Sequence, residues 1–189
     1  MATLFVDKID PQSGTSLEIG SSGDTITIPS GATITNSGTA TGFGGANTPA
    51  FYAHLSSSQS VSNNTDTKAQ INSELFDTDN CYDNSTNYRF TPTVAGHYFV
   101  TGCIAGESGT NDCISNVAYI YKNGSAYTNH SFNSDATFRR YTGMTTAVVY
   151  MNGSSDYIEL FGLVNSSGTS VEFNSGTKQT FFTAYKIIE

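Results

Sequence analysis

The sequence has no tryptophan, only three cysteines and four prolines, and charged residues make up just 13% of its 189 positions. The cysteines, Cys81, Cys103 and Cys113, are odd in number and lack metal-type spacing. A closed disulfide framework is therefore not expected. We expect buried free thiols, with a bridge between Cys103 and Cys113 as the alternative.

Long apolar runs and basic residues are scarce as well. No segment approaches the roughly 18 apolar residues of a membrane helix, and the first residues lack a basic region followed by an apolar run, so no secretory signal is expected. The chain has eight basic and sixteen acidic residues, which gives it a net charge of -8. A phosphate backbone would be repelled by this charge. Neither nucleic-acid binding nor membrane insertion is expected.

Glycine, serine, threonine and asparagine are abundant instead, together with 12 Phe and 11 Tyr, which is typical of turn-rich β architecture with an aromatic core. Beyond residue 48, turn clusters separate short runs of aromatic and β-branched residues. Asn123-Gly124 predicts a type I′ hairpin turn. We expect ten strands, at 49–55, 67–76, 87–91, 96–105, 115–122, 125–132, 143–151, 156–164, 169–174 and 179–188, which indicates a sandwich or barrel.

The first 48 residues form a separate, repetitive segment. Ser-Gly pairs recur about every eight residues between short alternating runs that are too short to bury an apolar face within one chain. We expect these runs to pack against copies from other chains as a β-stalk, whose core would be Leu17, Ile19, Ile26, Ile28 and Ile34. The alternative is a disordered Gly/Ser linker. Residues 39–48 are expected to be a hinge into the head.

Several strands are apolar on both faces, notably 157–164 and 180–187. One face can line a sandwich interior, and a second subunit would cover the other. The alternative is that both faces are core of one thick domain. We expect an aromatic interface between subunits, formed by Tyr98, Phe161, Phe181 and Tyr185.

Motifs for catalysis are missing: there is no Gly-x-Ser-x-Gly, no His-Glu-x-x-His and no phosphate-binding loop. The three histidines sit in strand-like contexts, where a structural role is expected. We therefore expect no enzymatic activity, with a glycan depolymerase as the alternative, since two placed carboxylates suffice for that reaction.

Two polar clusters are candidate binding sites. Asp77, Asp79 and Asp83 supply closely spaced oxygens that suit Ca²⁺, although the segment departs from the EF-hand template; the alternative is turn capping by these side chains. No other cofactor is expected. Arg139 and Arg140 beside Tyr141 form the only basic and aromatic cluster and are candidate ligand contacts, with a solvent-exposed strand end as the alternative.

Residues Tyr82-Asp83 and the run from Tyr88 to Val100, containing Phe90-Thr91-Pro92 and Gly96-His97-Tyr98-Phe99, resemble the globular head of complement component 1q, a relative of tumour necrosis factor. Asp156–Leu160 and Thr180–Phe182 extend the resemblance over about residues 48–189. It implies a ten-stranded jelly roll that trimerises through aromatic strand faces. Some heads of this family bind Ca²⁺.

Residues 4–43, by contrast, are similar to the N-terminal segments of tail-fibre and head-fibre proteins of marine bacteriophages, and no collagen-like Gly-x-y stalk occurs. The sequence therefore predicts an all-β homotrimer, with an anchor and repetitive β-stalk at 1–48 and a jelly-roll sandwich head at 49–189.

We expect a non-enzymatic virion fibre or spike, on the virion surface, that contacts other virion proteins through its N-terminus. Its head would bind a host-surface glycan or protein, because Tyr- and Asn-rich loops suit weak hydrogen bonding and stacking. The alternatives are a capsid decoration or cement protein with a mechanical role, and a complement-like pattern-recognition protein.

Overall fold

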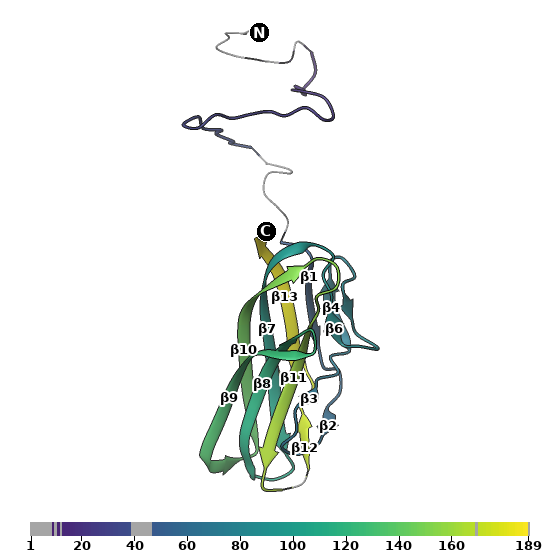
Figure 1. The fold of residues 1–189 in the computed structure, drawn as a ribbon, viewed down its shortest axis with the longest axis vertical. Helices are drawn as coiled ribbons and strands as arrows, with labels where there is room; N and C mark the ends of the chain where they lie inside the picture. The colour runs from purple at the N-terminus through teal and green to yellow at the C-terminus, as the bar shows by residue number, and fades with distance from the viewer. Residues whose placement is uncertain (1–8, 10, 12, 39–46, 169, 189) are drawn as a thin grey trace. The chain divides into compact units, whose positions relative to one another are not determined.

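The computed structural model describes residues 9, 11, 13–38, 47–168 and 170–188 (Figure 1). Contacts divide the chain into two units, Met1–Gly44 and Gly45–Glu189, and the second is called the head below. Within the described part of the chain, all regular structure is β-strand, and no helix with the length and hydrophobicity to span a membrane occurs.

The described residues of the first unit, 13–38 above all, contain turns but no strand. Turns lie at two of the expected Ser-Gly pairs, where Gly23 and Gly31 adopt positive φ angles of 96° and 86°. The described residues of this segment thus do not form the predicted β-structure in the single chain, because a short run without a partner strand cannot satisfy its backbone. Most of the expected hinge, residues 39–46, lies outside the described residues.

The five expected stalk-core side chains are between 45 and 61% exposed in this unit; they are Leu17, Ile19, Ile26, Ile28 and Ile34. Their packing between chains stays a prediction.

The described part of the head folds into thirteen strands in two antiparallel sheets. The seven-stranded sheet contains β1 (Ala50–His54), β2 (Gln59–Val61), β4 (Ser73–Asp77), β7 (Ala95–Ser108), β10 (Arg140–Asn152), β12 (Val171–Phe173) and β13 (Phe181–Ile188). The six-stranded sheet contains β3 (Thr67–Lys68), β5 (Tyr82–Asp83), β6 (Arg89–Phe90), β8 (Cys113–Lys122), β9 (Ser125–Phe138) and β11 (Ile158–Ser166).

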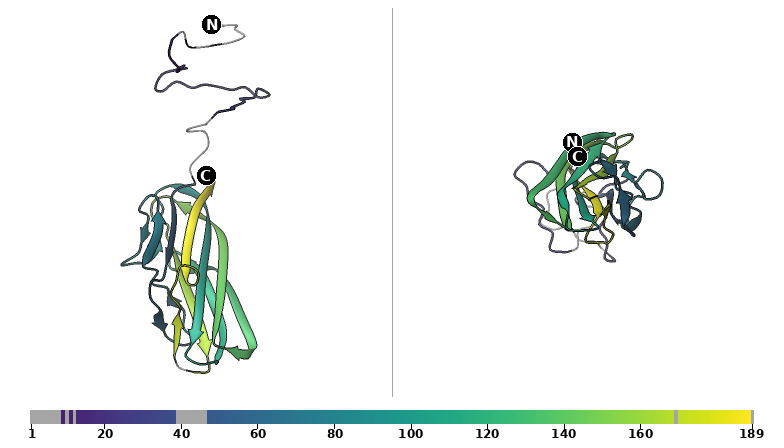
Figure 2. Two further views of the ribbon diagram at one scale, coloured as in Figure 1. Left: turned by 180° about the vertical axis from the view of Figure 1, so that it is seen from behind. Right: turned by 90° about the horizontal axis from the view of Figure 1, so that it is seen from below.

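The two sheets stack as layers, as the two views of Figure 2 show. In the larger sheet β7 is central, with β10 on one side and β13, β1 and β4 following on the other. The smaller sheet runs from β5 and β6 through β11 and β8 to β9. Strands β9 and β10 therefore lie at one side of the head, and β4, β5 and β6 at the other (Figure 1).

Aromatic side chains fill the space between the sheets. The Phe51 ring stacks on Tyr82 and Phe90 of the smaller sheet, with centroids 4.5 and 4.7 Å apart, and meets Phe182 edge-on. Gly102 of β7 lies directly against the Leu160 side chain of β11, so the sheets approach closely here. The three cysteines are buried and unbonded, and the alternative bridge between Cys103 and Cys113 is not formed.

The predicted strands match the observed ones with three differences. The run 67–76 is divided into β3 and β4, and the short strands β2 and β5 were not predicted. The Asn123-Gly124 turn is confirmed, since both residues have positive φ angles, 51° and 77°, and connect β8 to β9.

Candidate functional site

The outward face of the larger sheet carries an unusual number of large apolar side chains. Along β1, β7, β10 and β13 the alternate residues point into the core, which leaves the other set facing outward. We call this set the aromatic face; it comprises Tyr52, His54, His97, Phe99, Thr101, Cys103, Met144, Thr146, Val148, Tyr150, Phe181, Thr183, Tyr185 and Ile187.

Strand register places these side chains in rows. Phe99 on the central strand lies between Val148 of β10 and Tyr185 of β13, and the Phe99 and Tyr185 rings are 5.6 Å apart. His97 contacts the Tyr150 ring in the next row at 5.3 Å. The rows merge into one continuous surface across three strands.

This surface is open in the single chain. Five of its apolar side chains are between 38 and 53% exposed; they are Met144, Val148, Tyr150, Tyr185 and Ile187. Two buried ring nitrogens on the face, Nδ1 of His54 and Nδ1 of His97, have no hydrogen-bond partner among the described residues. Large contiguous apolar patches are rare on monomers and mark interaction sites, so the face has the properties of a protein interface.

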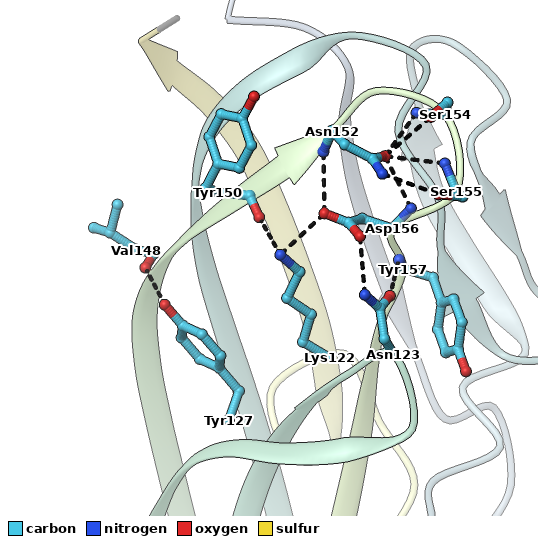
Figure 3. Close-up of polar contacts among 10 residues, drawn as sticks. All are labelled: Lys122, Asn123, Tyr127, Val148, Tyr150, Asn152, Ser154, Ser155, Asp156 and Tyr157. Atoms are coloured by element: carbon cyan, nitrogen blue, oxygen red, sulfur yellow. Dashed lines mark hydrogen bonds and ion pairs between the residues drawn. The ribbon is translucent and has the colours of Figure 1, made fainter.

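The backbone beneath this face is fixed by side chains of the neighbouring hairpin (Figure 3). Lys122 Nζ donates to the carbonyl of Tyr150 at 2.7 Å and pairs with Asp156 Oδ2 at 3.0 Å. The Tyr127 hydroxyl donates to the carbonyl of Val148 at 3.2 Å. Both contacts hold β10, an edge strand, in the position that presents Val148 and Tyr150 outward.

Further turn contacts anchor Lys122. Asn123 Nδ2 donates to Asp156 Oδ1 at 2.9 Å, and its own Oδ1 accepts from the Tyr157 backbone at 3.0 Å (Figure 3). The Asn152 side-chain oxygen accepts from the backbone of Ser154, Ser155 and Asp156. Hydrogen bonds from Asn123, and then the nearby Lys122 charge, outweigh the effect of burial and lower the pKa of the Asp156 carboxyl.

Of the four predicted interface residues, Phe181 and Tyr185 lie on the aromatic face. Tyr98 does not: it is fully buried in the core, and its hydroxyl donates to the carbonyl of Val94 at 2.7 Å. The prediction that Tyr98 lies at the interface is wrong, because the neighbouring residue Phe99 occupies the outward position. Phe161 lies on the smaller sheet, where its ring stacks on Tyr121 at 4.0 Å, so it belongs to a different surface.

The predicted ligand contacts have partners within the chain. Glu107, buried on β7, pairs with Arg139 Nε at 2.7 Å and with the Arg140 guanidinium. Burial opposes ionisation of Glu107, but hydrogen bonds from Arg140 and Asn174 outweigh it and lower the pKa of this carboxyl. The Tyr141 ring stacks on Phe132 at 3.6 Å. The cluster joins β7, β10 and the end of β12, while both arginine side chains remain exposed, so ligand contact through them stays a prediction.

The carboxylates of the candidate calcium loop are engaged with their own backbone. Asp83 accepts from the backbone of Ser85, Thr86 and Asn87 at 2.9 to 3.1 Å, and these bonds, that from Thr86 foremost, lower its pKa strongly. Asp77 Oδ2 accepts from the Tyr82 backbone at 2.8 Å.

Asp79 accepts from the Thr78 hydroxyl. Among the described residues, no group of three or more His, Cys, Asp or Glu side chains could hold a metal ion. The contacts favour turn capping, and calcium binding stays a prediction.

Comparison with known proteins identifies the fold. No protein-family model and no curated protein matches the sequence. The globular domain of zebrafish complement 1qA protein gives a TM-score of 0.52 at 13% identity, covering 75% of this chain and 98% of that chain. Eiger TNF from S. frugiperda gives a TM-score of 0.51 at 12% identity, covering 75% and 94%. The head therefore has the jelly-roll fold of complement 1q and tumour necrosis factor domains. Neither of the two similar proteins is named as an enzyme.

Proposed function

We propose that the protein is a homotrimeric binding protein in which the aromatic face is the contact between subunits. The observation that carries this proposal is the row of Val148, Phe99 and Tyr185, with Tyr150 beside it, which remains open on a sheet whose other side is already buried. Three copies around an axis would cover these side chains, and burial of each large apolar side chain contributes about 1.5–3 kcal/mol.

The finer role we propose is that of a short virion fibre or spike on the virion surface. Two features support it: the resemblance of residues 4–43 to phage fibre segments, and the exposed alternating side chains such as Ile26 and Ile28, which need partners from other chains. Residues 1–48 would form the stalk and attach to other virion proteins. The head would face outward and bind the host surface.

Binding rather than catalysis is supported by the chemistry of the head. Two of its ionisable clusters are committed to the fold, through the ion pairs of Glu107 and the turn-capping bonds of Asp83. A glycan is the ligand class that suits the polar loops, and threefold repetition would convert weak single sites into avidity.

The oligomeric state is the first test. Sedimentation equilibrium of the intact chain at about 10 μM should give three times the 20.1 kDa chain mass, and a single-chain mass would refute the proposed interface.

The second test is adsorption of the purified, labelled trimer to host cells. Adsorption supports the adhesive role. A trimer that does not adsorb would overturn adhesion and favour the mechanical role of capsid decoration.

A further inference from the structure

A polar hollow of about 560 Å³ opens on the side of the head away from β9 and β10. It lies where β4, at the edge of the larger sheet, approaches β5 and β6 of the smaller sheet, the side labelled β4 and β6 in Figure 1. Its volume falls within the range of small-ligand sites, about 300–1,000 Å³. Asp83 of the candidate calcium loop lines this hollow, whereas the aromatic face and the Glu107 cluster do not contribute to it.

Part of its lining is a fixed framework. The five hydrogen bonds that Asp83 accepts hold the loop 84–87 in place. The buried Tyr82 hydroxyl donates to the carbonyl of Ile71 at 3.0 Å. These bonds stiffen the wall before any ligand arrives, which reduces the entropy lost on binding.

Other polar groups of the lining have no use in the fold. The carboxylate of Glu74, the side-chain amides of Asn80 and Asn84 and the guanidinium of Arg89 line the hollow. None of the four forms a side-chain hydrogen bond or ion pair with a described residue. Glu74, Asn84 and Arg89 are half-buried, and their polar side-chain atoms are not among the fully buried ones, so they are open to solvent and to a ligand.

The arrangement of two of these groups is informative. The Arg89 guanidinium stacks over the Tyr157 ring at 4.5 Å from its centroid, so it is oriented without an acidic partner. Glu74 lies on β4, at the edge of the other sheet, and its pKa is raised by burial and, secondarily, by the charge of Asp77. A strong acceptor and a strong donor therefore line the same hollow without being paired to each other.

This combination restricts the chemistry of the occupant. Carboxylate and amide oxygens accept hydrogen bonds while the guanidinium and amide nitrogens donate them, and vicinal hydroxyls, which do both, match such a lining. Two carboxylates, Glu74 and Asp83, against one arginine leave the lining with an excess negative charge, in a chain of net charge -8. An anionic ligand is therefore disfavoured.

We propose that this hollow binds a neutral saccharide residue, with Glu74 accepting hydrogen bonds from sugar hydroxyls while Arg89 and Asn84 donate to sugar oxygens. The proposal rests on the glycan-binding function inferred above and assigns it a place on the head.

The test is saturation-transfer NMR of the intact protein with methyl glycosides of galactose, mannose and N-acetylglucosamine, and with methyl glucuronide as the anionic comparison. At least one neutral glycoside should bind with a dissociation constant of about 1–10 mM. Glu74→Gln and Asn84→Ala should each weaken it about tenfold, as expected for losing one hydrogen bond to a half-buried site. Glu172→Gln on β12, outside the hollow, is the matched control and should leave binding unchanged.

Three results would overturn the assignment: no neutral glycoside binding up to about 50 mM, equal binding by wild type and both hollow variants, or tighter binding of the glucuronide. Thermal unfolding of each variant checks its fold.

Adsorption of the same variants to host cells separates the two proposals. Wild type and hollow variants that adsorb equally would refute the hollow as the glycan site while leaving adhesion intact. The opposite outcome is also informative. If the wild-type trimer binds the sugar but does not adsorb to cells, and the variants lose sugar binding, the hollow is supported and adhesion is refuted.

Discussion

Substitution of Val148 by aspartate tests the proposed subunit contact directly. The Val148 side chain is 50% exposed in the single chain and lies beside Phe99 in the strand register. A carboxylate here remains in water in the monomer, so the stability of the isolated head should change by no more than about 0.5 kcal/mol. In the trimer the same carboxylate would be buried without a cation.

The size of the effect follows from threefold repetition. An unpaired buried charge costs about 3–5 kcal/mol, so three copies destabilise the trimer by about 9 kcal/mol or more. This raises the trimer dissociation constant by more than about six powers of ten. The midpoint concentration for assembly varies as the square root of that constant and should rise about a thousandfold.

Sedimentation velocity over a range of concentrations measures this midpoint. Val148→Asp should sediment as a folded monomer at about 10 μM, while Asn129→Asp, at an exposed position on β9, should stay trimeric. A Val148→Asp protein that remains a trimer with unchanged midpoint would show that the aromatic face is not the subunit contact.

Three further substitutions probe the core, the ion pairs and the stalk. Gly102→Ala would place its Cβ against Leu160, so urea unfolding should report a loss of about 1–3 kcal/mol, and unchanged stability would contradict the close approach of the sheets. The lowered pKa of Glu107 means that its ion pairs contribute stability above the unfolded-state pKa, about 4.3, and lose it as pH falls through the folded-state value. Glu107→Gln should therefore lower the Tm at pH 7 and flatten its decline below about pH 4.5, and an unchanged acid decline would contradict this. Replacing Ile26 and Ile28 by serine should lower the temperature at which the stalk of the trimer unfolds and leave the unfolding transition of the head unchanged. No effect on either transition would favour a disordered linker.

Local turn chemistry explains why much of the fold is predictable from the sequence. Asn123-Gly124 specifies its own backbone angles, so the hairpin between β8 and β9 follows from two adjacent residues. Strands β2 and β5, of three and two residues, are too short to leave a pattern of their own, and β2 depends in addition on the distant strand β12. The run 67–76 is interrupted because its start, β3, pairs with β11 of the smaller sheet while its end, β4, pairs with β1 of the larger sheet, a division set by tertiary structure.

The site was predictable in kind but not in register. An outward apolar face follows from strands that are apolar on both faces, yet the choice between Tyr98 and Phe99 depends on which of two adjacent side chains points inward. A shift of one residue moves every side chain to the other face, and only pairing with β13 and β10 fixes it. Likewise, the ion pair between Arg139 and Glu107 could not be read from the sequence, because the two residues lie 32 positions apart.

The two surfaces that the single chain leaves uncovered differ in how they can be covered. The aromatic face is built on long strands that are already hydrogen-bonded, so a partner subunit has only side chains to cover. Segments such as 24–28 must also fix their backbone conformation, which costs about 1–2 kcal/mol of conformational entropy per residue. Association of separate chains at low concentration does not offset this cost. Once three heads associate, each segment is tethered near two copies of itself at an effective concentration in the millimolar range. In the proposed trimer, association of the heads would therefore be the step that makes pairing of the N-terminal segments favourable, and the stalk should form after it.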